Sequence, residues 1–341
     1  MANRKQITFA NCNLFNLQLP NKPMYNGSKW TKKQYDKKID WTVKIISALN
    51  ADVIGFQELW HADALTEVFT KAGLLDDYVL MTEPANGSKI ICAAAVKKTL
   101  SPGTPSWMTK FPDKFKLESK GGDNQTPNIQ VNIDSYSRPV LRFTVTPRKN
   151  QTINVCVCHF KSKAPTQLWK NKWYKEDKKT YAPHAEGIGS ALSTIRRTAE
   201  AAALRMTLVD ELKGTDTSMV VLGDLNDAQL SNTLNVLTGQ PTYLTVLSKG
   251  GSDTDLYTVA TLQEYRSLRD VYYTHIHQNI KESLDHILVS QEFYDNSKKR
   301  IWAFAGMDIL NDHLHTDDHK EDGSSDHGIV KVTFKYKPEK K

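Results

Sequence analysis

Short apolar runs with strand character alternate with amphipathic helical stretches along the whole chain, and this alternation limits the fold more than any other feature. Strands are predicted at residues 7–13, 52–57, 90–96, 139–146, 153–160, 219–223, 283–289 and 327–334. The runs at 139–146 and 153–160 are apolar on both faces, which is typical of sheets that are covered on both sides. The pattern therefore predicts a layered α/β sandwich.

Two helical stretches are predicted to cover these sheets. The first follows Thr31, and its apolar residues recur at spacings of 4, 3 and 3 on one face: Ile39, Val43, Ile46 and Leu49. The second runs from about residue 190 to residue 212 and ends before Gly214, a typical helix stop. Its residues expected to face inward are Leu192, Ile195, Ala199, Ala202, Leu208 and Leu212.

Composition and length exclude several classes of protein. The longest apolar run covers residues 90–96, whereas a membrane-spanning helix needs about 18 apolar residues. Because the N-terminus also lacks an apolar signal core, we expect a cytoplasmic protein without a membrane partner. The 4 cysteines among 341 residues cannot build a disulfide framework, so we expect buried free thiols.

The chain is basic, with 45 Lys and Arg against 38 Asp and Glu, a net charge of +7. This balance favours a polyanionic partner such as nucleic acid. Basic and aromatic residues concentrate in 161–181, where seven lysines accompany Trp169, Trp173, Tyr174 and Tyr181. Such a mixture suits single-stranded or distorted nucleic acid, and a solvated loop with locally packed tryptophans is an equal alternative. The sequence indicates no protein partner.

The chain contains no internal repeat and no low-complexity tract. We therefore predict one domain over residues 1–341, with loop insertions around 97–136 and 161–189. The first insertion is rich in Pro, Gly, Lys and Asn, and its fold cannot be read from the sequence.

Acidic and amide side chains stand at the ends of four predicted strands, and we expect them to converge on one cleft. They are Asn13, Glu58, Asp224 with Asn226, and Asp326. Hard oxygen ligands of this kind suit Mg²⁺, with Mn²⁺ as an alternative, because these cations keep several waters and bind through a few carboxylates and phosphate oxygens. A thiolate–imidazole zinc site is not indicated.

Histidines accompany these oxygen ligands. His159 ends one strand, and His286 and His327 directly follow Asp285 and Asp326. A neutral imidazole held by a carboxylate can position or deprotonate a water, while a nearby acid protonates the departing alkoxide. The set therefore suits phosphodiester hydrolysis.

Six motifs in one order resemble the endonuclease/exonuclease/phosphatase superfamily, and within it the bacterial deoxyribonuclease-like nucleases. They are N-L-F-N-L (13–17), F-Q-E-L (56–59), C-H-F-K-S-K (158–163), G-D-L-N-D (223–227), L-D-H-I-L-V-S (284–290) and S-S-D-H-G (324–328). The resemblance covers essentially the whole chain. It implies a four-layer α/β sandwich of two central, mostly antiparallel sheets flanked by helices, with a metal-dependent site at one edge.

The resemblance also implies roles for individual residues. Glu58 would be the principal metal carboxylate, assisted by Asn13 and by Asp326 directly or through water. His327 would orient or deprotonate the attacking water, and Asp285 would hold its imidazole.

Other residues would act on the scissile phosphate. Asp224 would transfer a proton, Asn226 would donate a hydrogen bond to a non-bridging oxygen, and His159 would contact the phosphate or the leaving oxygen. Which residue is the acid and which the base stays open. Arg138 matches a phosphate-binding position of the family, and Lys161 and Lys163 would contact the nucleic-acid backbone, with surface solubility as the alternative for the two lysines.

Three functions are weighed on this basis. The first is a Mg²⁺-dependent nuclease, with DNA preferred over RNA as the substrate. The second is a phosphatase or phosphodiesterase of the same superfamily acting on a small phosphoester or a phospholipid headgroup, but G-D-L-N-D-A lacks the aromatic–arginine continuation of the inositol phosphatases. The third is a binding module without activity, which predicts a broken ligand position, and none is broken.

Overall fold

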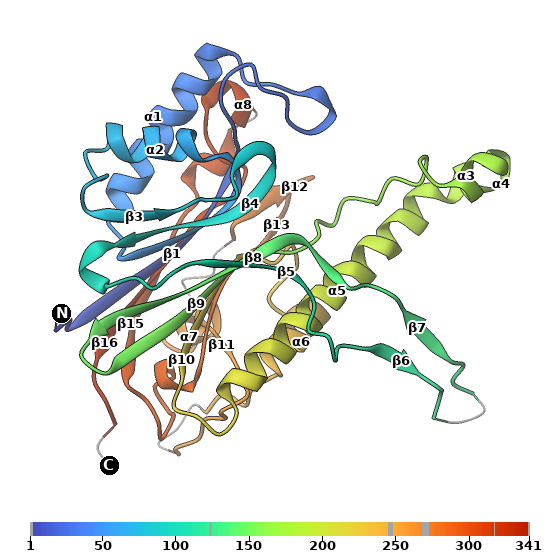
Figure 1. The fold of residues 1–341 in the computed structure, drawn as a ribbon. Helices are drawn as coiled ribbons and strands as arrows, with labels where there is room; N and C mark the ends of the chain where they lie inside the picture. Colours follow the sequence, from blue (N-terminus) through green and yellow to red (C-terminus); the bar gives the residue numbers. More distant parts are fainter. Residues whose placement is uncertain (1–2, 123–124, 245–247, 268–272, 317, 340–341) are drawn as a thin grey trace.

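Two six-stranded sheets stack face to face between layers of helices (Figure 1). The computed structural model describes residues 3–122, 125–244, 248–267, 273–316 and 318–339. Helices α1 (Lys32–Leu49) and α2 (Ala62–Lys71) cover the first sheet, and α5 (Ala185–Leu212) and α6 (Asn232–Thr238) cover the second. The predicted four-layer α/β sandwich is therefore confirmed.

The first sheet has the order β15-β16-β1-β2-β4-β3. The bounds are β1 (Gln6–Leu17), β2 (Val53–His61), β3 (Tyr78–Met81), β4 (Asn86–Lys97), β15 (Trp302–Leu310) and β16 (Ile329–Tyr336). The pair β1–β2 is parallel, and the other neighbours are antiparallel. The carboxyl ends of β1 and β2 thus lie at the same sheet edge as the start of β16.

The second sheet repeats this plan in the order β11-β14-β10-β9-β8-β5. The bounds are β5 (Ser106–Lys110), β8 (Ser135–Arg148), β9 (Gln151–His159), β10 (Ser218–Asp224), β11 (Tyr257–Thr258) and β14 (Asp285–Val289). Its parallel pair is β9–β10, and its other neighbours are antiparallel. Both sheets are mostly antiparallel, as predicted.

Strand alternation separates the interior into layers. On β2, Val53 faces the core between the sheets, and Ile54 and Phe56 face the core under α1 and α2. Gly55 points between the sheets, where an added Cβ would lie 2.9 Å from Cδ1 of Leu222. The sheets therefore approach closely at this point, which leaves no space for a side chain.

Local sequence fixes where α1 begins. Thr31 caps the helix: its hydroxyl accepts a hydrogen bond from the Gln34 backbone N–H, and the Gln34 side chain accepts one from the Thr31 backbone N–H. The predicted inward residues Ile39, Ile46 and Leu49 are fully buried under this cap. Val43, the fourth predicted residue, is only partly buried, whereas Lys38 and Thr42 are fully buried, so the periodicity predicted most but not all of the buried face.

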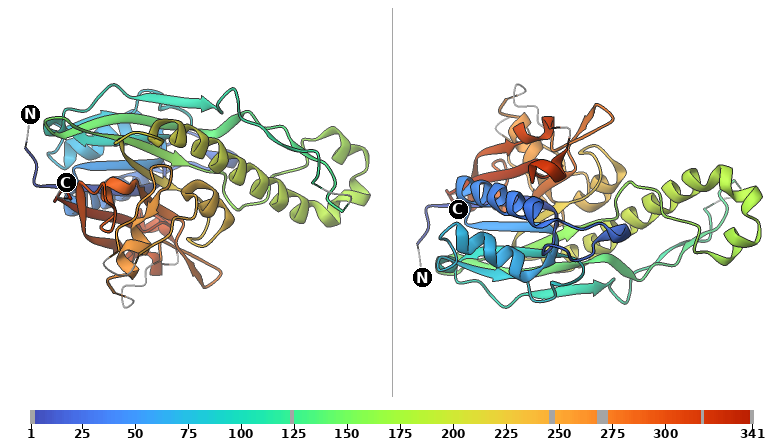
Figure 2. Two further views of the ribbon diagram at one scale, coloured as in Figure 1. Left: turned by 90° about the horizontal axis from the view of Figure 1, so that it is seen from below. Right: turned by 90° about the horizontal axis from the view of Figure 1, so that it is seen from above.

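The second predicted helix differs from expectation. It begins at Ala185, and Leu192 and Ile195 are 42% and 43% exposed, so their predicted inward orientation is wrong. The physical reason is that the N-terminal half of α5 projects past the sheet toward α3 (Lys172–Glu176) and α4 (Lys178–Tyr181), as Figure 2 shows. The helix packs on the sheet through residues from Ala199 onward, and Leu208 and Leu212 are buried there.

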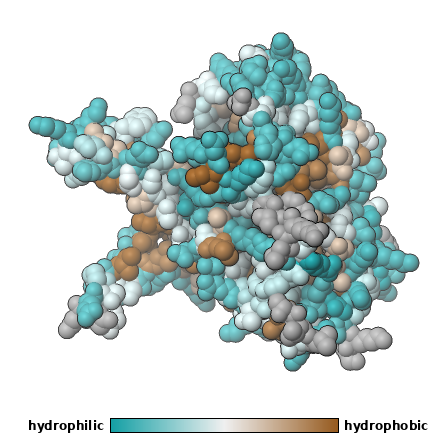
Figure 3. Space-filling view, turned by 180° about the vertical axis from the view of Figure 1, so that it is seen from behind, coloured by the Kyte–Doolittle hydropathy of each residue, from teal (hydrophilic) through white to brown (hydrophobic). Residues whose placement is uncertain are grey.

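A second projection comes from the segment 97–136. After β5, the strands β6 (Leu117–Ser119) and β7 (Ile129–Val131) pair as a separate antiparallel hairpin, and residues 123–124 lie outside the described residues. Figure 3 shows this hairpin and the α3–α5 projection standing apart, with hydrophobic residues gathered where they join the body. The hairpin β6–β7 is not part of either six-stranded sheet, whereas Leu100 and Phe111 of the same segment are buried in the cores of the molecule.

Smaller elements complete the described chain. They are β12 (His275–His277), β13 (Ile280–Glu282), α7 (Val259–Glu264), α8 (His319–Asp322) and five 3-10 turns, at Tyr25–Gly27, Lys98–Leu100, Ala182–His184, Gln291–Phe293 and Asp312–His315. The four cysteines are buried and free, as expected. In the part of the chain described, every helix is too short or too polar to cross a bilayer.

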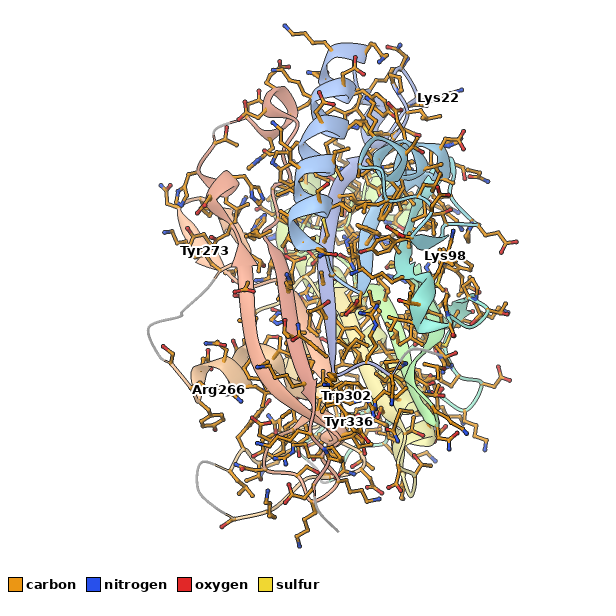
Figure 4. The ribbon with its side chains drawn as sticks, turned by 90° about the vertical axis from the view of Figure 1, so that its left-hand side faces the viewer. Lys22, Lys98, Arg266, Tyr273, Trp302 and Tyr336 are labelled. Atoms are coloured by element: carbon orange, nitrogen blue, oxygen red, sulfur yellow. The ribbon has the colours of Figure 1, made fainter. Side chains whose placement is uncertain are left out.

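The two ends of the β15–β16 pair differ in character. Trp302 and Tyr336 lie together at one end with their ring centroids 5.4 Å apart, and Figure 4 places them away from Tyr273. Tyr273 lies two residues before His275, the first residue of β12. The bridge between His275 and His327 joins β12 to the chain just before β16 begins. The polar sequence motifs lie at the end opposite to Trp302 and Tyr336.

Substitution of Gly55 by Ala tests the close approach of the sheets. The added methyl group collides with Leu222, so we expect the free energy of unfolding to fall by about 1–3 kcal/mol. Gly187→Ala is the control, because an added Cβ there meets no atom within 4 Å. Urea denaturation measures both variants, and an unchanged midpoint for Gly55→Ala would contradict the packing described.

Candidate active site

Sheet register brings the sequence motifs to one edge, called here the site edge. In the second sheet, Asp224 at the end of β10 pairs with His159 at the end of β9 and with Asp285 at the start of β14. In the first sheet, the end of β1 carries Asn13, and His327 stands just before β16. Because the two sheets are stacked, residues from both meet there.

A buried acid–imidazole pair forms the centre of the site edge. His327 Nδ1 lies 2.7 Å from Asp285 Oδ2, and His327 Nε2 lies 3.8 Å from Asp224 Oδ2. Burial alone would lower the pKa of His327, but the charges of Asp285 and Asp224 and the hydrogen bond to Asp285 raise the pKa well above its usual value. The imidazole is therefore stabilised in its protonated form.

Burial shifts the pKa of Asp224 in the opposite direction to its effect on a histidine. Its pKa is raised to about 7, chiefly by desolvation, while His327 opposes this shift and the charge of Asp285 adds to it. Asn13 Nδ2 donates a hydrogen bond to Asp224 Oδ2 at 3.0 Å, and the Asn226 backbone N–H donates one to Asp224 Oδ1 at 2.9 Å. A carboxyl group in this state can exchange a proton near neutral pH.

His159 completes the cluster as a neutral group. Its Nε2 lies 3.4 Å from Asp224 Oδ2, and burial lowers its pKa well below the usual value, with Arg138 and His327 adding to the effect. The contact therefore joins an uncharged imidazole to the Asp224 carboxyl group. Asn226 sits alongside with φ of 53°, and its Nδ2 donates to the Phe160 carbonyl at 3.1 Å.

A bulge in β2 sets the direction of Glu58. Phe56 and Leu59 both pack under α1 and α2 although they are three residues apart, so the strand contains one extra residue. Glu58 adopts a left-handed φ of 61°, and its Oε2 accepts a hydrogen bond from the Asn16 backbone N–H at 2.9 Å. Such backbone strain is typical of functional sites.

The surroundings of Glu58 suit a divalent cation. Desolvation raises its pKa and the charge of Asp326 raises it further, while His327, Arg138 and the Asn16 backbone hydrogen bond lower it. Glu58 and Asp326 are both partly exposed. Carboxylate oxygens with partial access to solvent suit a cation that keeps some of its waters. Asn13 Oδ1 already accepts a hydrogen bond from the Phe15 backbone N–H at 2.9 Å.

The three predicted phosphate-binding residues have different partners in the structure. Arg138 Nη1 donates to the Phe160 carbonyl at 2.9 Å, which keeps the guanidinium beside His159. Lys161 Nζ bonds within its own loop, to Ser162 Oγ and the Ala164 carbonyl. Lys163 Nζ lies 2.8 Å from Glu282 Oε1 and is held in that ion pair. The structure brings Arg138 to the cluster and leaves Lys163 outside it.

Four supporting residues were not predicted. Asn11 Nδ2 donates to Asp285 Oδ1 at 3.3 Å, and Gln57 Nε2 donates to Asn11 Oδ1 at 2.8 Å. Buried Glu200 of α5 accepts from the backbone N–H groups of residues 137 and 161, both at 2.7 Å. Asn11 and Gln57 had a sequence signal, because each is a polar residue at an inward position of its strand.

Lys38 is the fourth and carries a buried charge behind the site edge. It is fully buried on α1, and its Nζ donates to the Ser324 carbonyl at 2.9 Å. Burial lowers its pKa to about 8, against the opposing charges of Cys12, Asp326 and Glu58. Lys38 therefore fixes the turn that leads to Asp326 and adds a positive charge near both carboxylates. A lysine on a helix face carried no sequence signal for this role.

Comparison with protein families agrees with this geometry. Residues 31–327 match the model of the Endonuclease/Exonuclease/phosphatase family. The chain belongs to this family. Membership makes it a hydrolase of a superfamily that acts on phosphate esters, and the predicted resemblance is confirmed. A search of curated protein sequences gives no match.

Solved structures of this family share the fold at low sequence identity. The human Nocturnin catalytic domain with a bound sulfate anion has a TM-score of 0.56 and 13% identity, covering 99% of this chain and 97% of that one. A humanised D. rerio TDP2 has a TM-score of 0.54 and 13% identity, covering 97% and 99%. The family protein from Bacteroides vulgatus has a TM-score of 0.54 and 13% identity, covering 98% and 100%.

Substitution of Asp285 by Asn tests the cause of the His327 shift. Loss of the carboxylate charge should move the pKa of His327 down toward the unperturbed value of about 6.5. In the native chain the raised pKa adds stability below the unfolded-state pKa, and this stability disappears as the pH rises through the folded-state value. Histidine NMR titration measures the shift, and an unchanged pKa in Asp285→Asn would contradict the assignment.

Proposed function

We propose that the protein is a Mg²⁺-dependent nuclease that hydrolyses phosphodiester bonds, with DNA as the preferred substrate. The observation that carries the proposal is the His327 imidazole, held by Asp285 on one side and facing Asp224 on the other at one buried edge. Basic and amide groups, Arg138 and Asn226, lie beside it, where they suit a phosphate.

In this proposal His327 accepts a proton from the attacking water through Nε2. Asp285 fixes the ring through Nδ1, so that Nε2 is the nitrogen that remains for the water. The base must first be unprotonated, so activity should increase as the pH rises and His327, whose pKa is raised, loses its proton. Asp224, with a pKa of about 7, can return a proton to the leaving oxygen.

The phosphate would be held by groups around the Phe160 carbonyl. Arg138 and Asn226 both donate to that carbonyl, which fixes them next to each other. Each keeps further N–H donors for the non-bridging oxygens of a phosphate. Neutral His159 lies next to them and can donate to the same group. This set stabilises the added negative charge of the transition state.

Glu58 would be the main ligand of Mg²⁺, with Mn²⁺ as an alternative, and Asp326 and Asn13 would assist. When bound, the cation supplies Lewis-acid stabilisation of the phosphate charge. Nucleic acid as the substrate is supported by the +7 charge and by the basic projection, in which Trp169 and Trp173 are 55% and 40% exposed. Exposed aromatic rings beside lysines suit unstacked bases.

Substitution of Glu58 by Gln tests the cation site. The variant keeps the side chain's size and removes its charge, so we expect loss of Mg²⁺-dependent cleavage or a much higher Mg²⁺ requirement. Glu83→Gln, at an exposed position between β3 and β4, is the matched control and should cleave normally. Cleavage of plasmid DNA against Mg²⁺ concentration is the assay, and wild-type behaviour of Glu58→Gln would remove Glu58 from the site.

Neutralising lysines on the basic projection tests nucleic-acid binding. We expect the triple variant Lys170→Gln, Lys172→Gln and Lys175→Gln to bind DNA more weakly. The slope of log K against log salt should fall by up to about 0.9 for each lost phosphate contact. The control replaces Lys5, Lys335 and Lys337, which lie toward the opposite end of the sandwich. An equal salt slope in both triple variants would make the projection a solvated surface.

A further inference from the structure

His275 stands beside the proposed catalytic histidine and takes no part in the proposed reaction. The two residues form an isolated antiparallel bridge, and their ring centroids are 5.1 Å apart. The backbone around them is tight, since the Gly328 N–H donates to the Thr274 carbonyl at 2.7 Å and a Cβ on Gly328 would lie 3.1 Å from Thr274 Cα. The position of His275 is therefore built into the fold.

Thr274, directly before β12, connects this arrangement to the second sheet. Its buried Oγ1 accepts hydrogen bonds from the backbone N–H groups of Leu284 and Asp285, at 2.9 and 3.1 Å. Its own N–H donates to the Glu282 carbonyl at 2.9 Å. The hairpin β12–β13 is thereby attached to the strand that carries Asp285, so that His275 cannot move independently of the Asp285–His327 pair.

The donor atoms around His275 match a metal site. One ligand atom each from His275, Asp326 and His327 lie within 4.8 Å of one another. The Nδ1 atom of His275 is buried and has no hydrogen-bond partner among the described residues. A buried unpartnered nitrogen is costly, which indicates that a group outside the protein chain satisfies it.

Two nitrogens and one carboxylate differ in chemistry from the oxygen ligands proposed for Mg²⁺. Imidazole ligands favour borderline ions such as Zn²⁺, whereas Mg²⁺ takes oxygen ligands. In addition, Asp285 accepts from His327 Nδ1, and a carboxylate behind a metal-bound histidine is the usual support of a zinc ligand. Tetrahedral Zn²⁺ needs ligand atoms about 3.3 Å apart, so the three side chains need move only slightly.

We propose that His275, Asp326 and His327 form a Zn²⁺ site that inhibits the enzyme. The ion would occupy the His327 Nε2 lone pair, which the reaction needs for the proton of the attacking water, and would also engage Asp326. Its inhibitory consequence rests on the proposed function, whereas the binding of Zn²⁺ does not. Excess Mg²⁺ should not relieve the inhibition fully, because Mg²⁺ does not favour imidazole.

Calorimetric titration of Zn²⁺ into the metal-free, full-length protein tests the site. We expect His275→Ala to weaken this binding by about tenfold or more, since even supporting residues of metal sites change affinity by about 10–100-fold. His277→Ala is the matched control, because His277 is an exposed histidine on the same strand, and it should bind like the native chain. Native affinity in His275→Ala, or no binding by the native chain, would overturn the proposal.

Two further measurements keep the outcomes separate. In histidine NMR of the native chain, Zn²⁺ should shift the His275 and His327 signals together. This measurement does not depend on a variant that folds. A shift of the His327 signal without a shift of the His275 signal would contradict the site. Zn²⁺ should inhibit cleavage of DNA by the native chain in excess Mg²⁺. In His275→Ala, the Zn²⁺ concentration that gives half-inhibition should be at least tenfold higher. Zn²⁺ binding through His275 without any hydrolytic activity would contradict the proposed function alone.

Discussion

The hydrogen bond between Asp285 and His327 joins the two sheets of the molecule at the site edge. Asp285 begins β14 of the second sheet and is 2% exposed, while His327 directly precedes Gly328 and β16 of the first sheet. A buried carboxylate without partners would be strongly destabilising, so Asp285 depends on His327 and on Asn11. The contact that completes the site edge therefore also links the two sheets.

The core between the sheets and the site edge have different roles. Between the sheets, strands pack through Val53, Leu222 and their neighbours, and Gly55 allows the close approach. At the site edge the inward positions become polar: Gln57 donates a hydrogen bond to Asn11, and Asn11 donates one to Asp285. Glu58 and Asn226 adopt left-handed backbone conformations there. The closely packed apolar core stabilises an edge that is polar, charged and strained.

Much of the fold was readable from the sequence because strand runs are apolar and end in polar motifs. The α/β sandwich, most of the α1 face and the strand-end position of Asp224 followed from periodicity and from the family resemblance. The predicted strand end at Glu58 was wrong, because β2 continues through its bulge to His61. The exposure of Leu192 and Ile195 did not follow, because a periodic helix gives no information on where the sheet beneath it ends. The segment 97–136 had no regular pattern, and its hairpin depends on pairing between short strands.

Details of the site were harder to predict for a different reason. Glu58 points to the site edge only because β2 contains a bulge, and a bulge changes register without a clear sequence signal. Lys38 and His275 reach the site edge from α1 and from the hairpin β12–β13, and both are distant in sequence from His327. Their relation to His327 is a matter of tertiary packing, and no local pattern encodes it.

The most direct test of the central claim is a substrate panel with the native chain and Asp224→Ala. Plasmid DNA, single-stranded DNA, RNA, a soluble phosphodiester and an inositol phosphate are each incubated with Mg²⁺, Mn²⁺ or EDTA. The account predicts cation-dependent cleavage of nucleic acid, DNA above all, that EDTA and Asp224→Ala both abolish. Turnover of the small phosphoesters alone would contradict the nuclease and favour a phosphatase, and native activity in Asp224→Ala would contradict the site itself.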